Sequence, residues 1–368
     1  MKVMLLGLRG FPDVQGGVEK HVQELSQLLV KQGVEVNVIG RSSYQPVLPD
    51  QTWRGVKFTS IWAPQKKSLE AIVHTFLGVC YAALQRPDIL HIHAVGPSLM
   101  VPLARVFGLR VVVTHHGPDY DRQKWGKFAR FVLELGERWG MQYSNARIVI
   151  STVISQLIKS KYGLDSHLIP NGVQLPRLLT STVQLESFGL VPGQYILLVS
   201  RLVPEKRHID LVKAFSQSGL QGWKLAIVGA SDHPDDYLRE LQNLVSNTPD
   251  VVMTGYQSGD GLRELYSQAG LFVLPSSHEG LPIAMLEALS FGLPVLASDI
   301  PANLEVGLDA KHYFPLGDIQ ALAGKLKEFS RHQLTTDERN ATRQWVLEKY
   351  DWEKIAASTL QVYSNVAK

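Results

Sequence analysis

The sequence predicts an α/β protein made of two doubly wound domains. Short β-rich runs alternate with longer amphipathic runs along the chain, a pattern typical of parallel strands joined by right-handed crossover helices. The 368 residues exceed the roughly 250–300 at which a single hydrophobic core normally stops growing. The alternation weakens over residues 174–192 and then restarts. We therefore expect two cores of similar size, joined by a linker at residues 174–192.

The composition is that of a globular protein. Hydrophobic residues make up 45% of the chain and charged residues 19%, which excludes disorder, collagen and coiled coil as descriptions of the whole chain. Cys80 is the one cysteine, so an intramolecular disulfide and a zinc site built on cysteine pairs are also excluded. We interpret Cys80 as a small packed hydrophobe.

The N-terminal domain is expected at residues 1–173. Its first strand is residues 3–8, and residues 18–33 should form a helix because apolar side chains recur there on one face. Further strands are predicted in the following runs: residues 34–40, 88–94, 110–116 and 146–151. The helical run at residues 124–143 lies between two of these strands.

The C-terminal domain is expected at residues 193–350. Five β-rich runs separated by helical runs predict a second parallel sheet, and they lie at residues 195–200, 223–229, 251–255, 271–276 and 294–298. The final helix, residues 351–368, is expected to pack back on the N-terminal domain. Ligands of doubly wound sheets bind at the carboxyl ends of the strands, so the chemistry is expected in the loops that follow them.

The first residues lack the length and cleavage site of a signal peptide, and the longest apolar run, residues 72–84, is shorter than the ~20 residues that span a bilayer. We expect a cytoplasmic protein, with peripheral contact at the inner face of the membrane left open. Residues 1–173 carry 20 Lys and Arg against 12 Asp and Glu, a net +8, whereas the remainder carries 17 against 22, a net −5. The basic half suggests an anionic partner, although scattered solvated lysines would also explain it.

Two glycines, Gly16 and Gly17, precede the first helical run directly. Backbone N–H groups at such a helix start can approach a phosphate closely. The spacing is not that of a dinucleotide-binding fingerprint, so a nicotinamide site is not expected. An ordinary strand-to-helix turn is the alternative.

Arg201 and Lys206 lie in the loop after the strand at residues 195–200. A guanidinium fork and an ammonium group placed there can hold a diphosphate, although a solvated basic loop would look the same in sequence.

A second candidate loop follows the strand at residues 271–276. Glu279 precedes a Gly-Leu-Pro entry into a helix, and the backbone N–H groups of Gly280, Leu281 and Ile283 could grip a phosphate. Glu287 lies within that apolar helix, where a carboxylate is costly unless it is hydrogen-bonded. A ribose diol is a suitable partner for it, and an exposed position on the helix is the alternative.

These motifs together resemble the retaining glycosyltransferases of family four, whose fold is called GT-B. The resemblance rests on GGVEKHV, SRLVPEK and the two glutamates of EGLPIAMLE, and it covers nearly the whole chain. It is supported by HIHAVGP, VVVTHHG, IPNGV and SDIPANLEV. It implies two Rossmann-like domains facing each other across a cleft.

The resemblance implies a role for each donor-side residue. Arg201 and Lys206 would bind the donor diphosphate and stabilise the departing charge. Glu279 would face the hydroxyls of the donor sugar, and Glu287 would hold the ribose. Gly16 and Gly17 would offer their amides to the distal phosphate.

The resemblance also implies an acceptor side. His116 would line the sugar and acceptor site, with His115 as a neighbour that could exchange roles with it and His93 as a weaker candidate. His91 is expected to be a core residue. Residues 255–257, which include Gly255 and Tyr256, would approach the base. The residues expected to be catalytic are His116, Glu279, Arg201 and Lys206.

Asp119, Tyr120 and Asp121 spell D-x-D, which holds a metal ion in the other major glycosyltransferase fold. Here the triplet follows a His-Gly loop, so we expect no metal ion and no cofactor. The donor is expected to be a UDP- or GDP-sugar, because the role of Glu287 requires a ribose 2′-hydroxyl.

The expected function is therefore the retaining transfer of a sugar to a saccharide or lipid-linked acceptor, by a front-face route, in polysaccharide biosynthesis. Nucleic acid is not an expected partner. A catalytically silent nucleotide-sugar binding protein and a GT-B epimerase are the alternatives, and a phosphorylase would need a pyridoxal-phosphate lysine context that we do not find. Membrane contact is suggested by basic and aromatic residues in one helical run: Lys124, Trp125, Lys127, Phe128, Arg130 and Phe131. Burial of those aromatic rings in the core is the alternative.

Overall fold

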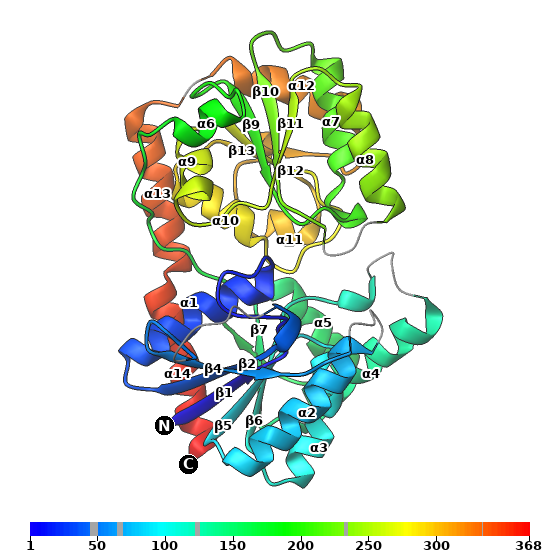
Figure 1. Ribbon diagram of the computed structural model, residues 1–368, viewed down its shortest axis with the longest axis vertical. Helices are drawn as coiled ribbons and strands as arrows, with labels where there is room; N and C mark the ends of the chain where they lie inside the picture. The colour runs from blue at the N-terminus through cyan, green and yellow to red at the C-terminus, as the bar shows by residue number, and fades with distance from the viewer. Residues whose placement is uncertain (45–50, 65–68, 122–125, 232–234, 333) are drawn as a thin grey trace. The chain divides into compact units, whose positions relative to one another are not determined.

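The structure is a computed structural model that describes residues 1–44, 51–64, 69–121, 126–231, 235–332 and 334–368. The chain forms two compact units. Unit 1 combines Met1–Gly172 with Trp352–Lys368, and unit 2 is Val173–Asp351. Each unit is a mainly or wholly parallel sheet flanked by helices (Figure 1), so the predicted α/β architecture is confirmed.

The sheet of unit 1 has the strand order β3-β4-β2-β1-β5-β6-β7-β8. Its pairs are parallel except for β3 with β4, which is antiparallel. Because β1 lies inside the sheet and later strands are added on both sides of it, the unit is doubly wound. The strands are β1 (Lys2–Leu6), β2 (Glu35–Arg41), β3 (Thr52–Trp53), β4 (Val56–Ile61), β5 (Ile89–His93), β6 (Val111–His115), β7 (Ala146–Val149) and β8 (His167–Leu168).

The helices of unit 1 pack their apolar faces on this sheet. Helix α1 buries Val22, Leu25 and Leu29, as the periodicity predicts, and ends before Gly33, whose φ of 83° favours glycine. The helices are α1 (Gly17–Lys31), α2 (Glu70–Gln85), α3 (Val101–Val106), α4 (Lys127–Tyr143), α5 (Thr152–Tyr162) and α14 (Trp352–Ala367), with short 3₁₀ turns η1 (Ser42–Tyr44), η2 (Pro97–Met100) and η3 (Asp119–Asp121).

The C-terminal helix α14 is an integral part of unit 1. It lies beside α1 (Figure 1) and buries Trp352, Ile355 and Tyr363 in the core of the unit. A Cβ on Gly172 would lie 2.6 Å from the Trp352 ring, so glycine is what allows the chain to pass this ring. The two stretches of unit 1, far apart in sequence, therefore share one core.

The sheet of unit 2 is parallel throughout, with the order β11-β10-β9-β12-β13-β14. Its strands are β9 (Tyr195–Val199), β10 (Lys224–Val228), β11 (Val251–Gly255), β12 (Leu271–Leu274), β13 (Val295–Ser298) and β14 (Tyr313–Phe314). Its helices are α6 (Val183–Ser187), α7 (His208–Ser218), α8 (Asp236–Ser246), α9 (Gly259–Gln268), α10 (Ile283–Ser290), α11 (Pro301–Leu304), α12 (Ile319–Ser330) and α13 (Thr336–Tyr350), with 3₁₀ turns η4 (Pro204–Lys206) and η5 (Ala310–His312).

The segment expected as a linker, residues 174–192, belongs to unit 2 instead. Its helix α6 buries Leu185 completely. The carboxylate of Glu264 accepts the backbone N–H groups of Gln184 and Leu185 at 2.6 and 3.1 Å. The weakened alternation that suggested a linker thus reflects a short helix anchored by a side chain on α9. In the described parts of the chain, no helix combines the length and apolar character needed to cross a bilayer.

Candidate functional site

Two predicted site residues meet at the carboxyl edge of the unit 2 sheet. Lys206 ends the 3₁₀ turn η4 after β9, and Glu279 follows β12, which is the neighbour of β9 in the sheet. The Lys206 ammonium donates to Glu279 Oε1 at 2.5 Å. The two side chains expose only 16% and 11% of their surface. Adjacent parallel strands therefore bring together a cation and a carboxylate that are 73 positions apart in sequence.

The loop that carries Lys206 is held on both sides. Ser277 donates its backbone N–H to the Glu205 carbonyl at 2.8 Å, which ties η4 to the loop after β12. Buried His208 bonds Ser200 Oγ at 2.8 Å and the Tyr237 hydroxyl at 2.9 Å. Burial, together with the nearby Lys206 charge, lowers the pKa of His208 to about 3, so its ring is neutral at pH 7. The cationic loop is thus positioned before any ligand arrives.

Glu287 lies on α10 and is half-buried. The Tyr266 hydroxyl donates to its Oε2 at 3.4 Å, and burial together with the Glu287 charge raises the pKa of Tyr266 well above 10. The residue is therefore not the fully exposed helix-face glutamate of the alternative interpretation. Leu281 is buried just before the start of α10, while Gly280 and Ile283 are half-buried beside it.

The other predicted donor residues occupy different loops of unit 2. Arg201 is half-buried two residues after the end of β9. Gly255 ends the edge strand β11 with a φ of 72°, and Tyr256 after it exposes 43% of its surface. Gln257 bonds the Thr254 carbonyl at 2.9 Å. Because β9, β10 and β11 are parallel neighbours, Arg201 and Tyr256 lie at the same edge of the sheet as Lys206.

In unit 1, the start of α1 is built around an ion pair that the sequence analysis did not identify. Arg9 holds Glu19 through its backbone N–H and its Nε, both at 3.1 Å from Oε1. Burial favours the neutral acid, but the Arg9 charge and hydrogen bonds outweigh it and lower the pKa of Glu19. A Cβ on Gly16, whose φ is 151°, would lie 2.0 Å from Glu19 Oε2. Gly16 and Gly17 therefore lead into α1 in a conformation that only glycine fits at the first position.

Three histidines gather in unit 1 at the ends of β5 and β6 and on α1. His93 Nδ1 and His116 Nε2 are 3.0 Å apart. The His21 ring lies 4.9 Å from the His116 ring, centre to centre, and His21 Nδ1 bonds Asn171 Oδ1 at 2.9 Å. The sequence analysis named His93 and His116 but missed His21. The sequence pattern that could have identified His21 is its position next to Val22 and four residues before Leu25, on the side of α1 that is buried.

These imidazoles are neutral at pH 7. Burial and the neighbouring histidines lower the pKa of His93 and of His116 well below 6.5. Burial lowers the pKa of His21 to about 4, although its bond to Asn171 opposes the shift. His91 bonds the Tyr363 hydroxyl at 2.6 Å and Thr114 Oγ1 at 2.7 Å and is completely buried, so it is a core residue.

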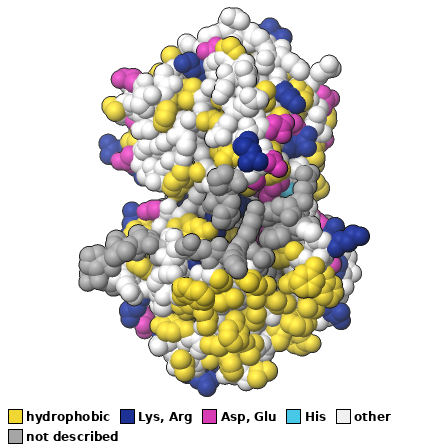
Figure 2. All heavy atoms as spheres, turned by 45° about the vertical axis from the view of Figure 1, so that its right-hand side comes forward, with side chains coloured by type: hydrophobic (Ala, Val, Ile, Leu, Met, Phe, Trp, Pro, Cys, Tyr) yellow, Lys and Arg dark blue, Asp and Glu magenta, His cyan; other side chains and the backbone are white. Residues whose placement is uncertain are grey.

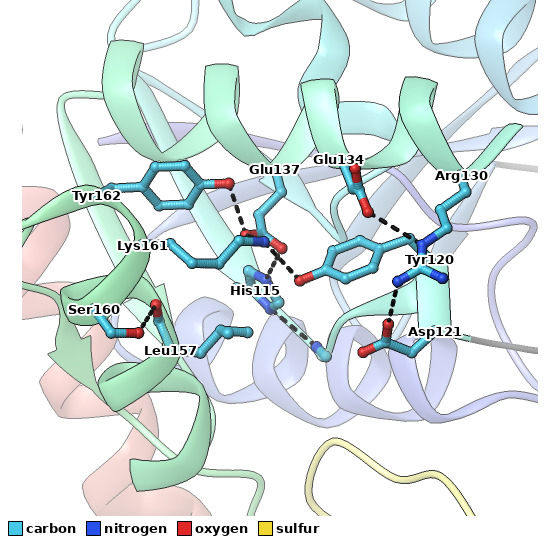
Figure 3. Close-up of polar contacts among 11 residues, drawn as sticks. His115, Tyr120, Asp121, Arg130, Glu134, Glu137, Leu157, Ser160, Lys161 and Tyr162 are labelled. Atoms are coloured by element: carbon cyan, nitrogen blue, oxygen red, sulfur yellow. Dashed lines mark hydrogen bonds and ion pairs between the residues drawn. The ribbon is translucent and has the colours of Figure 1, made fainter. Parts of the chain in front are cut away.

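His115 belongs to a separate buried network (Figure 3). Its Nε2 lies 3.5 Å from Glu137 Oε2, and its Nδ1 accepts the Gly117 backbone N–H at 3.1 Å. Glu137 also accepts hydrogen bonds from Lys161 and Tyr162, both at 2.8 Å. The Nδ1 of His115 is thus bonded to Gly117 and its Nε2 faces Glu137, whereas His116, the next residue, joins the histidine cluster.

A pocket of about 320 Å³ adjoins this network. Its lining combines apolar and charged side chains, namely Phe131, Glu134, Leu135, Arg138, Lys161 and Tyr162. Lys161 connects the pocket to Glu137 and so to His115 (Figure 3).

The D-x-D triplet forms the 3₁₀ turn η3. Asp121 pairs with Arg130 of α4 at 3.3 Å, and Tyr120 is buried with its hydroxyl 3.0 Å from the Lys161 ammonium. Lys124 and Trp125 lie outside the described residues. Phe128 and Phe131 expose 80% and 60% of their surface, so the alternative that these rings are buried in the core is wrong.

Comparison with known proteins agrees with this architecture. The sequence model of Glycosyltransferase Family 4 matches residues 15–177, and that of Glycosyl transferases group 1 matches residues 186–345. Sucrose-phosphate synthase from Thermosynechococcus elongatus has a similar fold, with a TM-score of 0.81 and 20% identity over 99% of this chain and 98% of that one. Anabaena Alr3699/HepE in complex with UDP and glucose gives a TM-score of 0.81 and 17% identity over 99% and 100%. The fold is that of the GT-B glycosyltransferases.

Relatives in sequence are also named as glycosyltransferases. The phosphatidyl-myo-inositol mannosyltransferase of Mycobacterium leprae is 26% identical over 96% of this chain and 94% of its own length. The putative teichuronic acid biosynthesis glycosyltransferase TuaC of Bacillus subtilis is 27% identical over 77% and 72%. The chain belongs to the group 1, family 4 glycosyltransferases.

Proposed function

We propose that the protein transfers a sugar, with retention of anomeric configuration, from a UDP- or GDP-linked donor to a saccharide or lipid-linked acceptor. The Lys206–Glu279 pair at the ends of β9 and β12 is the observation that carries this proposal. Its cation suits a diphosphate leaving group, and its carboxylate suits the hydroxyls of a sugar. Two of the relatives are named for phosphatidyl-myo-inositol and for teichuronic acid biosynthesis. We therefore place this protein in polysaccharide or glycolipid biosynthesis.

The main catalytic demand is stabilisation of the charge that develops on the departing diphosphate. Fixed cations in a site that excludes water meet this demand without reorganisation during the reaction. Lys206 has three N–H donors, so it can keep its bond to Glu279 and still donate to a phosphate oxygen. Arg201, from the same loop, can add a guanidinium fork. The departing phosphate would then help to deprotonate the acceptor hydroxyl on the same face.

The same two cations make a metal ion unnecessary for this step in our proposal. The D-x-D triplet is a poor substitute for them, because Asp121 is paired with Arg130. On the ribose side, Glu287 is half-buried beside the Tyr266 hydroxyl and can accept hydrogen bonds from a 2′,3′-diol. Gly16, Gly17 and the N–H groups of Gly280, Leu281 and Ile283 are proposed phosphate contacts, and Gly255 and Tyr256 are proposed to approach the base.

On the acceptor side we propose His116, which its environment keeps neutral and therefore able to accept a hydrogen bond from a hydroxyl. The nearby pocket mixes the rings and chains of Phe131 and Leu135 with the cations Arg138 and Lys161. Such a lining suits an acceptor that has both an apolar and an anionic part. His115 supports this region through Glu137 instead of touching the acceptor.

Contact with an anionic membrane surface is proposed for the same unit. Figure 2 shows apolar side chains gathered over a broad face of unit 1. Large exposed apolar residues of unit 1 include Ile72, Phe76, Leu84, Val106, Phe128 and Phe131. Lys127 and Arg130 are exposed on the same helix as the two phenylalanines. Aromatic and basic side chains together are typical of binding at a lipid interface.

The proposal is tested with a panel of nucleotide sugars. Binding of the true donor should raise the unfolding midpoint in proportion to its occupancy. The stabilising donor is then supplied in radiolabelled form with candidate acceptors, and the anomeric configuration of the product is read by NMR. Stabilisation without transfer would favour the silent binding protein, and conversion of the donor without an acceptor would favour the epimerase. Flotation with anionic and with neutral vesicles tests the membrane contact.

A further inference from the structure

The histidine cluster of unit 1 has a geometry that the proposed transfer reaction does not require. His21, His93 and His116 each offer one ring nitrogen, and these three atoms all lie within 4.8 Å of one another. They come from three different elements: α1, the end of β5, and the residue after β6. His21 and His93 are buried and His116 is half-buried. The cluster is therefore a preformed convergence of imidazoles inside one unit.

The protonation of His21 is determined by its neighbour. Asn171 Oδ1 lies 2.9 Å from His21 Nδ1, and an amide oxygen can only accept a hydrogen bond. The ring proton is therefore on Nδ1, which leaves the lone pair on Nε2. Histidines that bind metal ions are typically oriented in this way, by an acceptor on the nitrogen that does not face the ion.

His93 and His116 are separated by a distance that suits two ligands of one ion. His93 Nδ1 and His116 Nε2 are 3.0 Å apart and share a hydrogen bond, which a bound ion would replace. With Zn–N bonds of about 2.0–2.1 Å, neighbouring ligand nitrogens lie roughly 3.0–3.4 Å apart.

We propose that His21, His93 and His116 form a binding site for a divalent transition-metal ion of the zinc type. Imidazole is a good ligand for Zn²⁺, Co²⁺, Ni²⁺ and Cu²⁺ and a poor one for Mg²⁺, which prefers oxygen. Three histidines with a fourth position left for water are a known zinc coordination. The ligand nitrogens, now up to 4.8 Å apart, must approach to about 3.4 Å, a shift that requires rotation of the side chains.

The ion would have a consequence for the transferase, and this part alone rests on the proposed function. It would occupy a ring nitrogen of His116, the side chain that we propose contacts the acceptor. Micromolar zinc should therefore inhibit sugar transfer, and a chelator should restore it. The binding itself is measured independently of turnover, so failure of one proposal is distinguishable from failure of the other.

The test uses the full-length protein, freed of metal with a chelator and then dialysed. Co²⁺ is titrated while visible absorption is recorded, because cobalt in a tetrahedral nitrogen site gives characteristic bands. Zn²⁺ is then added to displace it, and Zn²⁺ and Mg²⁺ are compared by calorimetry. We expect one equivalent of Co²⁺ and of Zn²⁺ to bind, and no detectable Mg²⁺. Absence of a one-to-one complex would overturn the proposal.

Single-residue variants test whether the three histidines are the residues that bind the ion. His21→Gln and His93→Gln should each weaken Zn²⁺ binding by at least tenfold, and Asn171→Ala should weaken it by about 10–100-fold, as loss of an orienting partner does. His332→Gln is the matched control, because that side chain is 70% exposed in unit 2 and should leave binding unchanged. Circular dichroism verifies the fold of each protein. Should His93→Gln fail to fold, His21→Gln and Asn171→Ala still decide. Equal Zn²⁺ affinity in wild type and in these two variants would place the ion elsewhere.

Discussion

Charged side chains in this protein differ in how many partners hold them, and this difference determines what their removal does. Glu137 is completely buried and is contacted by His115, Lys161 and Tyr162. Lys206 and Glu279 pair with each other in two loops at the ends of neighbouring strands. Loss of Glu137 should therefore affect folding, whereas loss of Lys206 should mainly affect chemistry.

Lys206→Ala should lower turnover by about 10²–10³ while leaving the fold intact, because it removes one charge-stabilising donor in the transition state. Steady-state transfer assays measure the rate, and thermal unfolding checks the fold. Lys213→Ala is the control, since Lys213 is an exposed residue of α7. Near-normal turnover of Lys206→Ala would remove Lys206 from the diphosphate site.

Glu287→Gln should weaken donor binding about tenfold or more and reduce the preference for ribonucleotides. The amide keeps the size of the side chain but loses charge-assisted bonds to the ribose, each worth roughly 1.5–3 kcal/mol. Calorimetric titration of both proteins with the nucleoside diphosphate and its 2′-deoxy analogue measures this. Glu240→Gln, on the exposed face of α8, is the control and should leave the affinity for both nucleotides unchanged. Equal affinities in all combinations would leave Glu287 without a ribose role.

Glu137→Gln should destabilise unit 1 in a manner that depends on pH. Burial raises the pKa of this carboxyl, but interactions with His115, Lys161 and Tyr120 lower it by more than burial raises it. The net result is a pKa of about 2. A folded-state pKa below the ordinary 4.5 stabilises the protein above pH 4.5, by about 3 kcal/mol for a shift of this size, and the effect is lost as the pH falls towards 2.

The measurement is thermal unfolding of wild type and Glu137→Gln between pH 7 and pH 3. The gap between their midpoints should narrow steadily below pH 4.5. Glu134→Gln is the matched control on the same helix, because Glu134 pairs with Arg130 at the surface and is 43% exposed. A gap that is constant with pH would mean that the charge of Glu137 does not stabilise the fold.

At the scale of elements, strand order explains which loops meet. β9 and β12 are neighbours, which places Lys206 beside Glu279. β5 and β6 are neighbours too, which places His93 beside His116. Helix α6 is positioned differently, because its start is held by hydrogen bonds to one side chain of α9, Glu264, and not by strand order.

Glu264→Ala should therefore loosen α6 from unit 2. The change leaves two backbone N–H groups, of Gln184 and Leu185, without their acceptor, at a cost of about 1–3 kcal/mol each if they stay buried. Limited proteolysis should then cut within residues 180–190 faster than in wild type. Glu240→Ala on exposed α8 serves as the comparison. Unchanged cleavage would show that α6 is held by Leu185 alone.

At the scale of the whole molecule, the positive charge is unevenly distributed. Residues 1–173, which make up most of unit 1, carry a net charge of +8, and the remainder carries −5. The cations proposed to hold the diphosphate, Arg201 and Lys206, nevertheless lie in the acidic part of the chain. Local placement at strand ends, and not net charge, thus decides where the proposed leaving group is stabilised.

Sugar transfer should survive EDTA, because Arg201 and Lys206 supply the positive charge that a metal ion would otherwise provide. Rates are compared with and without the chelator, using one donor and acceptor pair. The rate should stay constant, or rise if the histidine cluster had held an inhibitory ion. Loss of turnover that Mg²⁺ or Mn²⁺ restores would contradict the metal-independent mechanism.

The alternation of strands and helices could be predicted from the sequence, because side-chain periodicity is a local property of each segment. Lys206 and Glu279 could be named for the same reason, since a loop after a buried strand is recognisable by its neighbours alone. Their direct contact could not be predicted from either motif, because it depends on β9 and β12 being adjacent in the sheet.

Tertiary structure alone decided the partners of the remaining polar groups. His21 lies beside His93 and His116, and Glu137 contacts His115 and Lys161. These residues are far apart in the sequence, so no local sequence pattern predicts that they meet. The same holds for Glu264, whose bonds to α6 turned an expected linker into part of unit 2. The physical reason is common to all three: a buried polar side chain must find a hydrogen-bond partner, and the fold determines which one is within reach.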